Sequence, residues 1–428
     1  MPDWSRPYLD PWTTPAALWL AIVAVAAVIR LRGRALALVA VGAAIGIAVW
    51  KSWVIGPPNG LLDLQIYTNS ARTWLDGGSL FTYRAPVFNL GATYPPIGIL
   101  PFVLLDPLSA DAREVLFTLL SIGAIAVAAR AAAVLAGVAA GRRVDWTLWA
   151  VAIAVVSMPV WLTLRQGQVN ALLWAMVLGD VLLLRRGSRL AGIGIGAATA
   201  IKLVPGLFIL WLLVCGWRRP ALRAVLTAVG STALGWVLAP GDSRRFWTEL
   251  LWNSDNVGRL DDARNNSVLG ALADVLGAGP LRTALWLGLA ALLCLLGMRR
   301  ARDATRRGDL LVAVVIVGCT SALVSPISWT HHLGYLVLAG AALLPLVVGD
   351  RRRILLLVLL ALPVIDPGHL GDSRLTSLLR MALMVGIVLA LPIIDDRSGT
   401  PERSPAPAAT VPPRAQALTT PSRRSTNS

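Results

Sequence analysis

One carboxylate and one ammonium group have the surroundings expected of functional residues. Asp63 opens the polar run at 63–67, and a positioned carboxylate can take a proton from a reacting hydroxyl group. Lys202 lies between two apolar runs, where a lone ammonium is costly unless it meets a carboxylate, a phosphate or a short route to the surface. These two residues are the first candidates for a functional site.

Four further polar clusters interrupt the apolar sequence. They are Tyr94-Pro95-Pro96, Gln166-Gly167-Gln168-Val169-Asn170, Arg264-Asn265-Asn266-Ser267 and His331-His332. Five polar motifs at one face of a membrane bundle would describe a pocket better than they describe scattered loops.

Each motif also has a plain structural interpretation. Asp63 can be the N-cap of an interfacial helix over 64–75, and a capping carboxylate can still act as a base. The residues that such a helix would turn toward the membrane are Leu64, Tyr67, Ala71, Trp74 and Leu75.

The other motifs have similar alternatives. Gln168 and Asn170 can begin a helix or form hydrogen bonds between helices. The Tyr94-Pro95-Pro96 run favours a chain reversal, and His331-His332 can be ordinary interfacial residues at a helix start.

The composition requires a membrane protein. Of the 428 residues, 56% are hydrophobic and only 14% are charged, with a mean hydropathy of +0.68. A spanning helix needs about 20 apolar residues, and such stretches recur from Pro15 almost to Asp395. We therefore expect an all-α bundle of about 11–13 transmembrane spans at residues 1–394, followed by a disordered, cytoplasmic Pro/Ser/Thr/Arg-rich tail at 395–428.

The net charge of +16 does not indicate a nucleic-acid partner. The arginine clusters are short and stand between apolar spans, where the positive-inside rule places cytoplasmic loops. This rule puts all the polar motifs on the external side. The three cysteines lie in apolar segments without metal-ligand spacing, so neither a disulfide nor a zinc site is expected.

The expected spans follow from the apolar runs and the arginine clusters between them. They are 15–29, 35–54, 112–135, 146–163, 171–184, 221–239, 281–298, 310–324, 333–348, 354–365 and 375–394.

Two apolar stretches need another explanation. The short piece 97–108 is interrupted by Pro101 and Pro107 and is interpreted as re-entrant or interfacial. The stretch 190–216 has basic residues on both sides, which predicts a broken hairpin with Lys202 and Pro205 near its turn. Irregular backbone at membrane depth is tolerated only where it is buried or lines a cavity.

In their order along the chain, these motifs resemble a known class of enzymes. D-L-x-x-Y at 63–67 followed by Y-P-P at 94–96 is similar to the GT-C membrane glycosyltransferases. The runs R-Q-G-Q-V-N, A-I-K-L-V-P, N-N-S-V-L-G and S-P-I-S-W-T-H-H resemble the actinobacterial polyprenol-phosphate-mannose-dependent α-(1→2)-mannosyltransferases, relatives of the phosphatidylinositol-mannoside enzyme. The resemblance covers about 54–392, and the extra span 15–29 departs from it.

The resemblance implies an inverting mannosyl transfer on the external face of the plasma membrane. The donor would be a polyprenyl-phosphate-linked mannose, and the acceptor a mannose-containing glycolipid or lipoglycan of the cell envelope. Asp63 would be the general base, with no cofactor and no metal, because protein cations meet the leaving phosphate.

The remaining roles follow from the same resemblance. The donor phosphate would be bound by Lys202, Arg165, His331 and His332. The sugars would be bound by Tyr67, Tyr94, Gln168, Asn170, Asn266 and Ser267. A transporter or flippase of a lipid-linked sugar is the alternative, since it would show the same hydropathy and the same broken hairpin.

Overall fold

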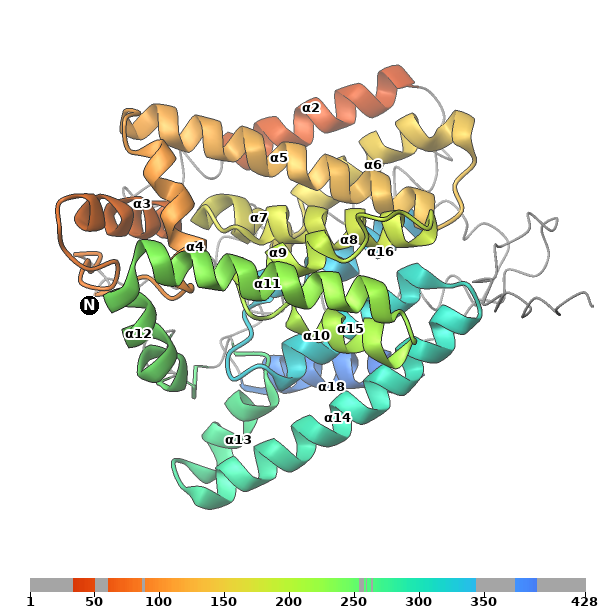
Figure 1. The fold of residues 1–428 in the computed structure, drawn as a ribbon. Helices are drawn as coiled ribbons and strands as arrows, with labels where there is room; N and C mark the ends of the chain where they lie inside the picture. The colour runs from red at the N-terminus through yellow and green to blue at the C-terminus, as the bar shows by residue number, and fades with distance from the viewer. Residues whose placement is uncertain are drawn as a thin grey trace, which may run out of the picture.

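The structure, a computed structural model, describes residues 34–50, 61–86, 89–253, 258, 260–262, 265–343 and 374–390. Every regular element within these ranges is helical, which confirms the all-α class (Figure 1). The expected spans 15–29 and 354–365 and the tail 395–428 lie outside the described residues.

Helices follow one another along the described chain. They are α2 (Arg34–Trp50), α3 (Leu62–Leu75), α4 (Pro96–Ile99), η4 (Leu100–Leu105), α5 (Ala110–Leu135), η5 (Ala140–Arg142), α6 (Arg143–Val155), α7 (Met158–Gln166), α8 (Asn170–Arg185), α9 (Ile193–Ile201), α10 (Gly206–Val214), α11 (Arg218–Leu238), α12 (Pro240–Thr248), η6 (Leu250–Trp252), α13 (Val268–Leu276), α14 (Pro280–Arg306), α15 (Leu310–Val324), η8 (Thr330–His332), α16 (Gly334–Leu343) and α18 (Arg374–Ala390).

Within the described residues, 3 helices are long and apolar enough to cross a bilayer, namely α5, α11 and α14. The expected span 146–163 is divided into two helices, α6 and α7, which form a pair bent by 73°. The bend falls at Val156–Ser157, just before Pro159 in the first turn of α7. Proline has no N–H to continue a preceding helix, so it favours a new helix start. If the bent pair is one span, the total rises to 4.

Small residues bring the central helices together. The buried face of α5 contains a run of alanines, including Ala124, Ala128 and Ala132, and it packs on α8. Alanines allow two helix backbones to approach closely in lipid, where no hydrophobic effect drives association. In contrast, α11 and α14 expose leucines along most of their length, as expected of helices that face lipid.

The stretch 190–216 folds as the expected broken hairpin. Gly192 and Gly196 of α9 pack on the backbone of Pro220 and Ala224 in α11, so α9 runs parallel to α11. Since α10 leads into α11 through residues 215–217 only, α10 returns in the opposite direction. The tip of the hairpin is therefore the break at 202–205, with Lys202 in extended conformation.

The start of this hairpin is fixed by a buried carboxylate. Asp180 of α8 accepts hydrogen bonds from the backbone N–H groups of Gly192 at 2.8 Å and Ile195 at 2.9 Å. A carboxylate at a helix N-terminus satisfies N–H groups that have no partner within the helix. Asp180 thereby holds α9 against α8, and with it the position of Lys202.

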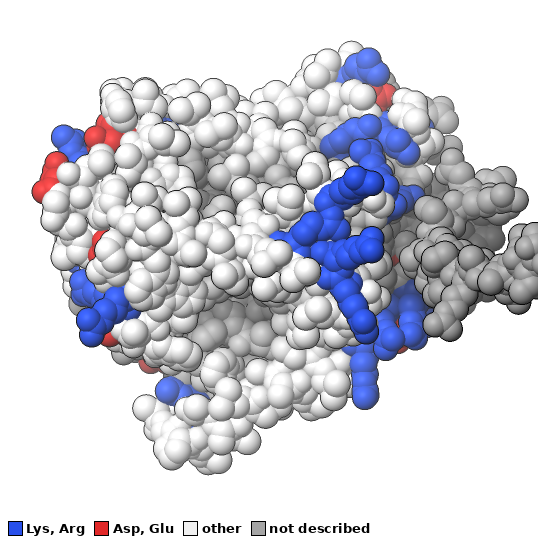
Figure 2. Space-filling model, viewed as in Figure 1, with Lys and Arg blue, Asp and Glu red and all other residues white. Residues whose placement is uncertain are grey.

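The largest group of basic side chains in Figure 2 lies on the side where α8 ends and α11 begins, and smaller basic groups lie beside acidic side chains at the other end. Two arginines near the end of α8 and the start of α11 bind neighbouring backbone: Arg185 donates to the carbonyl of Val134 at 2.6 Å, and Arg223 to the carbonyl of Arg189. The tip of the α9–α10 hairpin lies at the opposite end of α9.

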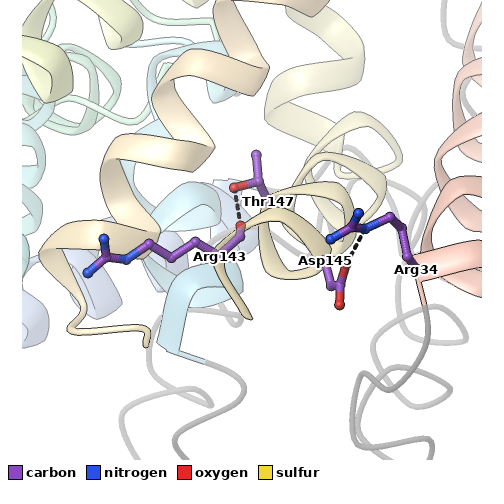
Figure 3. Close-up of polar contacts among 4 residues, drawn as sticks. All are labelled: Arg34, Arg143, Asp145 and Thr147. Atoms are coloured by element: carbon purple, nitrogen blue, oxygen red, sulfur yellow. Dashed lines mark hydrogen bonds and ion pairs between the residues drawn. The ribbon is translucent and has the colours of Figure 1, made fainter. Parts of the chain in front are cut away.

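At the start of α6, Arg34 of α2 forms an ion pair with Asp145 at 3.0 Å. Figure 3 shows this pair and the hydrogen bond that the Thr147 hydroxyl donates to the carbonyl of Arg143 at 2.7 Å. The Arg143 guanidinium also donates to the carbonyl of Val138 at 2.7 Å. Of these contacts, the Arg34–Asp145 pair joins α2 to α6, and the other two lie within residues 138–147.

The other expected elements differ from the structure mainly in length. α14 continues through Arg299 and Arg300 to Arg306, because the arginines and alanines after 298 are good helix formers. The piece 97–108 is two short helices, α4 and η4, too short to cross a bilayer. Between the expected spans 221–239 and 281–298, the structure contains the helices α12 and α13.

Candidate active site

Asp63 lies inside the first turn of α3 and does not cap it. The helix begins at Leu62 with Leu61 as the N-cap, and no side chain caps it, so the capping interpretation is wrong. The expected orientation of α3 is also wrong in part, since Leu64, Tyr67 and Ala71 are buried in the protein. They pack against η4 and α7, which means that the apolar stripe of this helix faces the bundle.

A glycine turn at the end of α7 brings Gln168 to Asp63. Gly167 has a φ of 67°, a left-handed conformation that glycine adopts without strain. A Cβ atom at Gly167 would lie 2.6 Å from the Cβ of Leu64 and 2.9 Å from that of Leu61. This close contact seats the turn on the start of α3.

We expect Gly167→Ala to destabilise the protein by about 2–5 kcal/mol, from left-handed strain plus overpacking against α3. Gly137 is the matched control, because its φ is 81° and nothing lies within 4 Å of its Cβ position. Gly137→Ala should therefore cost only the strain of about 1–2 kcal/mol. Thermal unfolding in detergent measures the stability of both variants. Equal losses of stability would mean that the contact of Gly167 with α3 does not contribute.

Gln168 makes three hydrogen bonds at the centre of the site. Its Nε2 donates to Oδ2 of Asp63 at 2.5 Å. Its Oε1 accepts from the Tyr94 hydroxyl at 2.5 Å and from the Lys202 ammonium at 3.4 Å. The side chain is buried, so most of its polar capacity is used within the protein.

The Lys202 ammonium is held by neutral groups. It donates to Oδ1 of Asn170 at 3.1 Å and lies 5.1 Å from the centre of the Tyr94 ring. The backbone before it is fixed by α4, because a Cβ on Gly98 would lie 2.5 Å from the carbonyl oxygen of Ile201. Lys202 therefore projects its charge into the site from the tip of the hairpin.

His331 and His332 form the short helix η8 beside Lys202. Nδ2 of Asn170 donates to the carbonyl of His331 at 3.1 Å. The N–H of Trp329 donates to Nδ1 of His332 at 3.3 Å, which places the ring proton of a neutral His332 on Nε2. Nε2 of His331 is buried and has no hydrogen-bond partner among the described residues.

Burial and the nearby Lys202 charge lower the pKa of both histidines well below the usual range. Both rings are therefore neutral at pH 7. Burial also raises the pKa of Asp63 to about 6, although the Gln168 hydrogen bond and the Lys202 charge oppose the rise. At pH 7 Asp63 is ionised yet more basic than an exposed aspartate.

Two aromatic side chains form a wall next to Asp63. The rings of Tyr67 and Tyr94 are stacked with centres 4.2 Å apart, and the Tyr67 hydroxyl lies 3.1 Å from that of Thr93. Arg165 is buried on α7, with its guanidinium 5.2 Å from the centre of the Trp161 ring. Since α7 packs against η8, Arg165 lies on the helix next to the two histidines.

Asn266 and Ser267 shape the loop that leads to η8. Asn266 donates to the carbonyl of Ser328 at 3.1 Å, and Ser267 to the carbonyl of Pro326 at 2.8 Å. The Ser267 hydroxyl also caps α13 by accepting from the N–H of Gly270. Asn265 joins them, as its Oδ1 accepts from the N–H of Ser328 at 2.9 Å.

The structure thus joins six expected site residues in one hydrogen-bonded set, with Tyr67 stacked on Tyr94 and His332 against His331. The six are Asp63, Tyr94, Gln168, Asn170, Lys202 and His331. Asn266 and Ser267 act on the loop before η8. Three residues with a part in these contacts were not expected, namely Thr93, Asn265 and Asp180. Only Asn265 could have been noticed in the sequence, because it forms an asparagine pair with Asn266.

Comparison with known proteins gives the family. The model of glycosyltransferase family 87 matches residues 92–326. A polyprenol-phosphate-mannose-dependent alpha-(1-2)-phosphatidylinositol mannoside mannosyltransferase of Mycobacterium tuberculosis is 31% identical over 339 residues, which are 75% of this chain and 78% of that protein. The corresponding pentamannoside mannosyltransferase of Mycolicibacterium smegmatis is 33% identical over 306 residues, or 68% and 72% of the two chains.

No solved structure matches the chain. The family match nevertheless includes Tyr94, Gln168, Asn170, Lys202, Asn266 and Ser267. With more than half of its length matched, this membrane protein belongs to glycosyltransferase family 87.

Proposed function

We propose that the chain transfers a mannosyl unit from a polyprenyl-phosphate donor to a hydroxyl group of a mannose-containing glycolipid or lipoglycan. Asp63 takes the proton of the acceptor hydroxyl while its oxygen bonds to the anomeric carbon. The bond from that carbon to the phosphate oxygen breaks, and its electron pair leaves with the lipid phosphate. A single in-line displacement inverts the configuration, so a β-linked donor gives an α-mannoside.

One observation carries this proposal: a partly buried carboxylate of raised pKa and a partly buried cation lie on either side of one amide, that of Gln168. Only Oδ2 of Asp63 accepts a hydrogen bond from the described residues, and Oδ1 is left for an acceptor hydroxyl. Lys202 provides a charge for the phosphate as it leaves, and such a positioned charge stabilises a transition state more than a ground state.

The donor phosphate would be bound by Lys202 together with Arg165, His331 and His332. The two histidines are neutral hydrogen-bonding groups, which leaves the lysine and the arginine to supply charge. For the sugars, Tyr67, Tyr94, Asn170, Asn266 and Ser267 remain the proposed contacts. Asn266 and Ser267 would act mainly by shaping the loop that they hold.

The family assignment favours this reaction over transport. The two mycobacterial relatives are named mannosyltransferases that depend on polyprenol-phosphate-mannose. The purified protein, incubated with polyprenyl-phosphate-mannose and a mannosylated phosphatidylinositol, should form an α-linked product. A protein that moved the lipid-linked sugar across a vesicle membrane without forming a glycosidic bond would instead support the transporter alternative.

The rate of mannosyl transfer should fall at acid pH. Asp63 must be ionised to accept a proton, and its pKa is raised to about 6 by burial. We expect full activity above this pH and a fall of about tenfold per unit below it. The two histidines have lowered pKa values, so they should not change the rate near pH 6. A rate that begins to fall only near pH 4 would contradict the role of Asp63.

We further propose that the site faces the outside of the plasma membrane and that the arginine-rich end faces the cytoplasm. Support comes from the arginines gathered at the end away from the hairpin tip (Figure 2) and from the positive-inside rule. Reporter fusions should report outside after Asp63, Asn170, Ala273 and His332, and inside after Arg34, Arg186, Arg300 and Arg353. An inside signal at Asn170 would place the site on the wrong face.

A further inference from the structure

The carboxamide of Gln168 stands between the two charged groups of the site. It donates to Asp63 on one side and accepts from Lys202 on the other. Tyr94 donates to the same amide oxygen. With 7% of its surface exposed, the side chain has little left to offer a sugar.

We infer that Gln168 is a positioning residue: it orients the Asp63 carboxylate and prevents that carboxylate from pairing directly with Lys202. The inference rests on the proposed function, in which Asp63 is the base and Lys202 meets the phosphate. It assigns Gln168 a different role from the sugar ligand that the motif alone suggested.

The need for such a spacer follows from the partial burial of both charges. Opposite charges attract far more strongly in a protein interior than in water, so Asp63 and Lys202 would close onto each other if only apolar groups lay between them. A direct pair would commit the ammonium to the base and weaken the basicity of the carboxylate. The amide satisfies both charges without cancelling either.

The bond pattern also leaves the reacting atoms available. Gln168 binds Oδ2 of Asp63 alone, which leaves Oδ1 for the acceptor. On the other side, the Lys202 ammonium binds two amide oxygens, those of Gln168 and Asn170. An ammonium has three N–H donors, so one remains for the donor phosphate.

The backbone around Gln168 fixes the position of its amide relative to Asp63. Gly167 presses on α3 immediately before Gln168, and the Gln168 N–H donates to the carbonyl of Thr163 at 2.9 Å. Gln168 and Asp63 are thus fixed to each other by main chain as well as by side chain. Such preorganisation is what a general base needs, because small misplacements cost large factors in rate.

The decisive variant is Gln168→Glu, which keeps the shape and places a second carboxylate against Asp63. Two touching carboxylates share a proton. The acid limb of kcat, which is the range of low pH over which kcat falls, should therefore move up by about one pH unit or more. The other titratable or charged groups around Asp63 are Tyr67 on α3, Tyr94 before α4, Arg165 on α7, Lys202 at the hairpin tip, and His331 and His332 in η8. All are unchanged in this variant.

Gln168→Met tests the same role without a new charge. It keeps the length but removes all three hydrogen bonds, so kcat should fall on the order of a hundredfold while the acceptor KM stays within about threefold. Gln166→Glu is the matched control, since Gln166 lies two residues earlier and its Oε1 has no partner among the described residues. Its acid limb should coincide with that of the unaltered chain.

The outcomes separate the roles. Restored turnover at alkaline pH in Gln168→Glu supports positioning, because a folding defect would lower activity at every pH. A raised donor or acceptor KM with an unmoved acid limb overturns it in favour of a sugar ligand. An unmoved limb combined with a kcat of Gln168→Met equal to that of the unaltered chain overturns it outright.

A measurement without turnover keeps this test apart from the proposed function. The infrared band of a protonated carboxyl, identified by its loss in Asp63→Asn, reports ionisation of Asp63 in the resting protein. Its midpoint should rise in Gln168→Glu even if the sugar donor differs from the proposed one. If the unaltered chain transfers no mannose, the proposed function fails; if the band midpoint stays in place, the positioning role fails.

Discussion

Asp63→Asn should lower mannosyl transfer on the order of a hundred- to ten-thousandfold, the usual cost of losing a general base. The asparagine oxygen can still accept the hydrogen bond from Gln168 that Oδ2 of Asp63 accepts at 2.5 Å. Since α3 begins at Leu62 and is not capped by Asp63, the helix should form unchanged. The variant should be well folded and still bind the donor.

The matched control is Asp145→Asn, the same chemical change on α6, far along the sequence from the site. Asp145 pairs with Arg34 near the surface (Figure 3), and exposed pairs contribute about 0–1 kcal/mol. Its transfer rate should equal that of the unaltered chain. Turnover assays with donor-binding measurements on both variants decide the matter, and normal transfer by Asp63→Asn would remove Asp63 from the mechanism.

The sequence predicts the membrane class and the broken hairpin well, because both depend on local composition. Lys202 and Pro205 within an apolar stretch, with arginines at each side, allow few other arrangements. The bend between α6 and α7 was missed, since the apolar run 146–163 has the length and hydropathy of one span. Only packing around Ser157 and Pro159 reveals two helices.

The sequence names candidate site residues but does not indicate the contacts between them. Asp63, Gln168 and Lys202 lie in three separate motifs, and nothing in their spacing indicates that Gln168 bonds to both of the others. The burial of α3 was also missed. Its apolar stripe fits a membrane surface as well as a protein surface, and only the contact with Gly167 distinguishes them.

Lys202→Met should reduce kcat/KM for the lipid-phosphate donor on the order of a hundred- to a thousandfold. This is the usual effect of removing one positioned group that stabilises developing negative charge. Methionine keeps most of the length of the lysine stem and loses the charge together with the hydrogen bonds to Asn170 and Gln168. No carboxylate lies within ion-pair distance of the ammonium in the described part of the chain, so the variant should still fold, with a loss of about 1–3 kcal/mol from the amide oxygens that lose their donor.

The position of the remaining charges sharpens this prediction. His331 and His332 are neutral at pH 7 because burial lowers their pKa values, and neither can replace the lost cation.

Arg219→Met is the matched control, since it removes an exposed charge next to the start of α11, at the opposite end of the hairpin from Lys202. Donor kinetics should separate the two variants, with Arg219→Met close to the unaltered chain. If Lys202→Met keeps its donor kinetics and loses only thermal stability, then Lys202 is a structural partner of Asn170 and Gln168, and the phosphate must be met by Arg165.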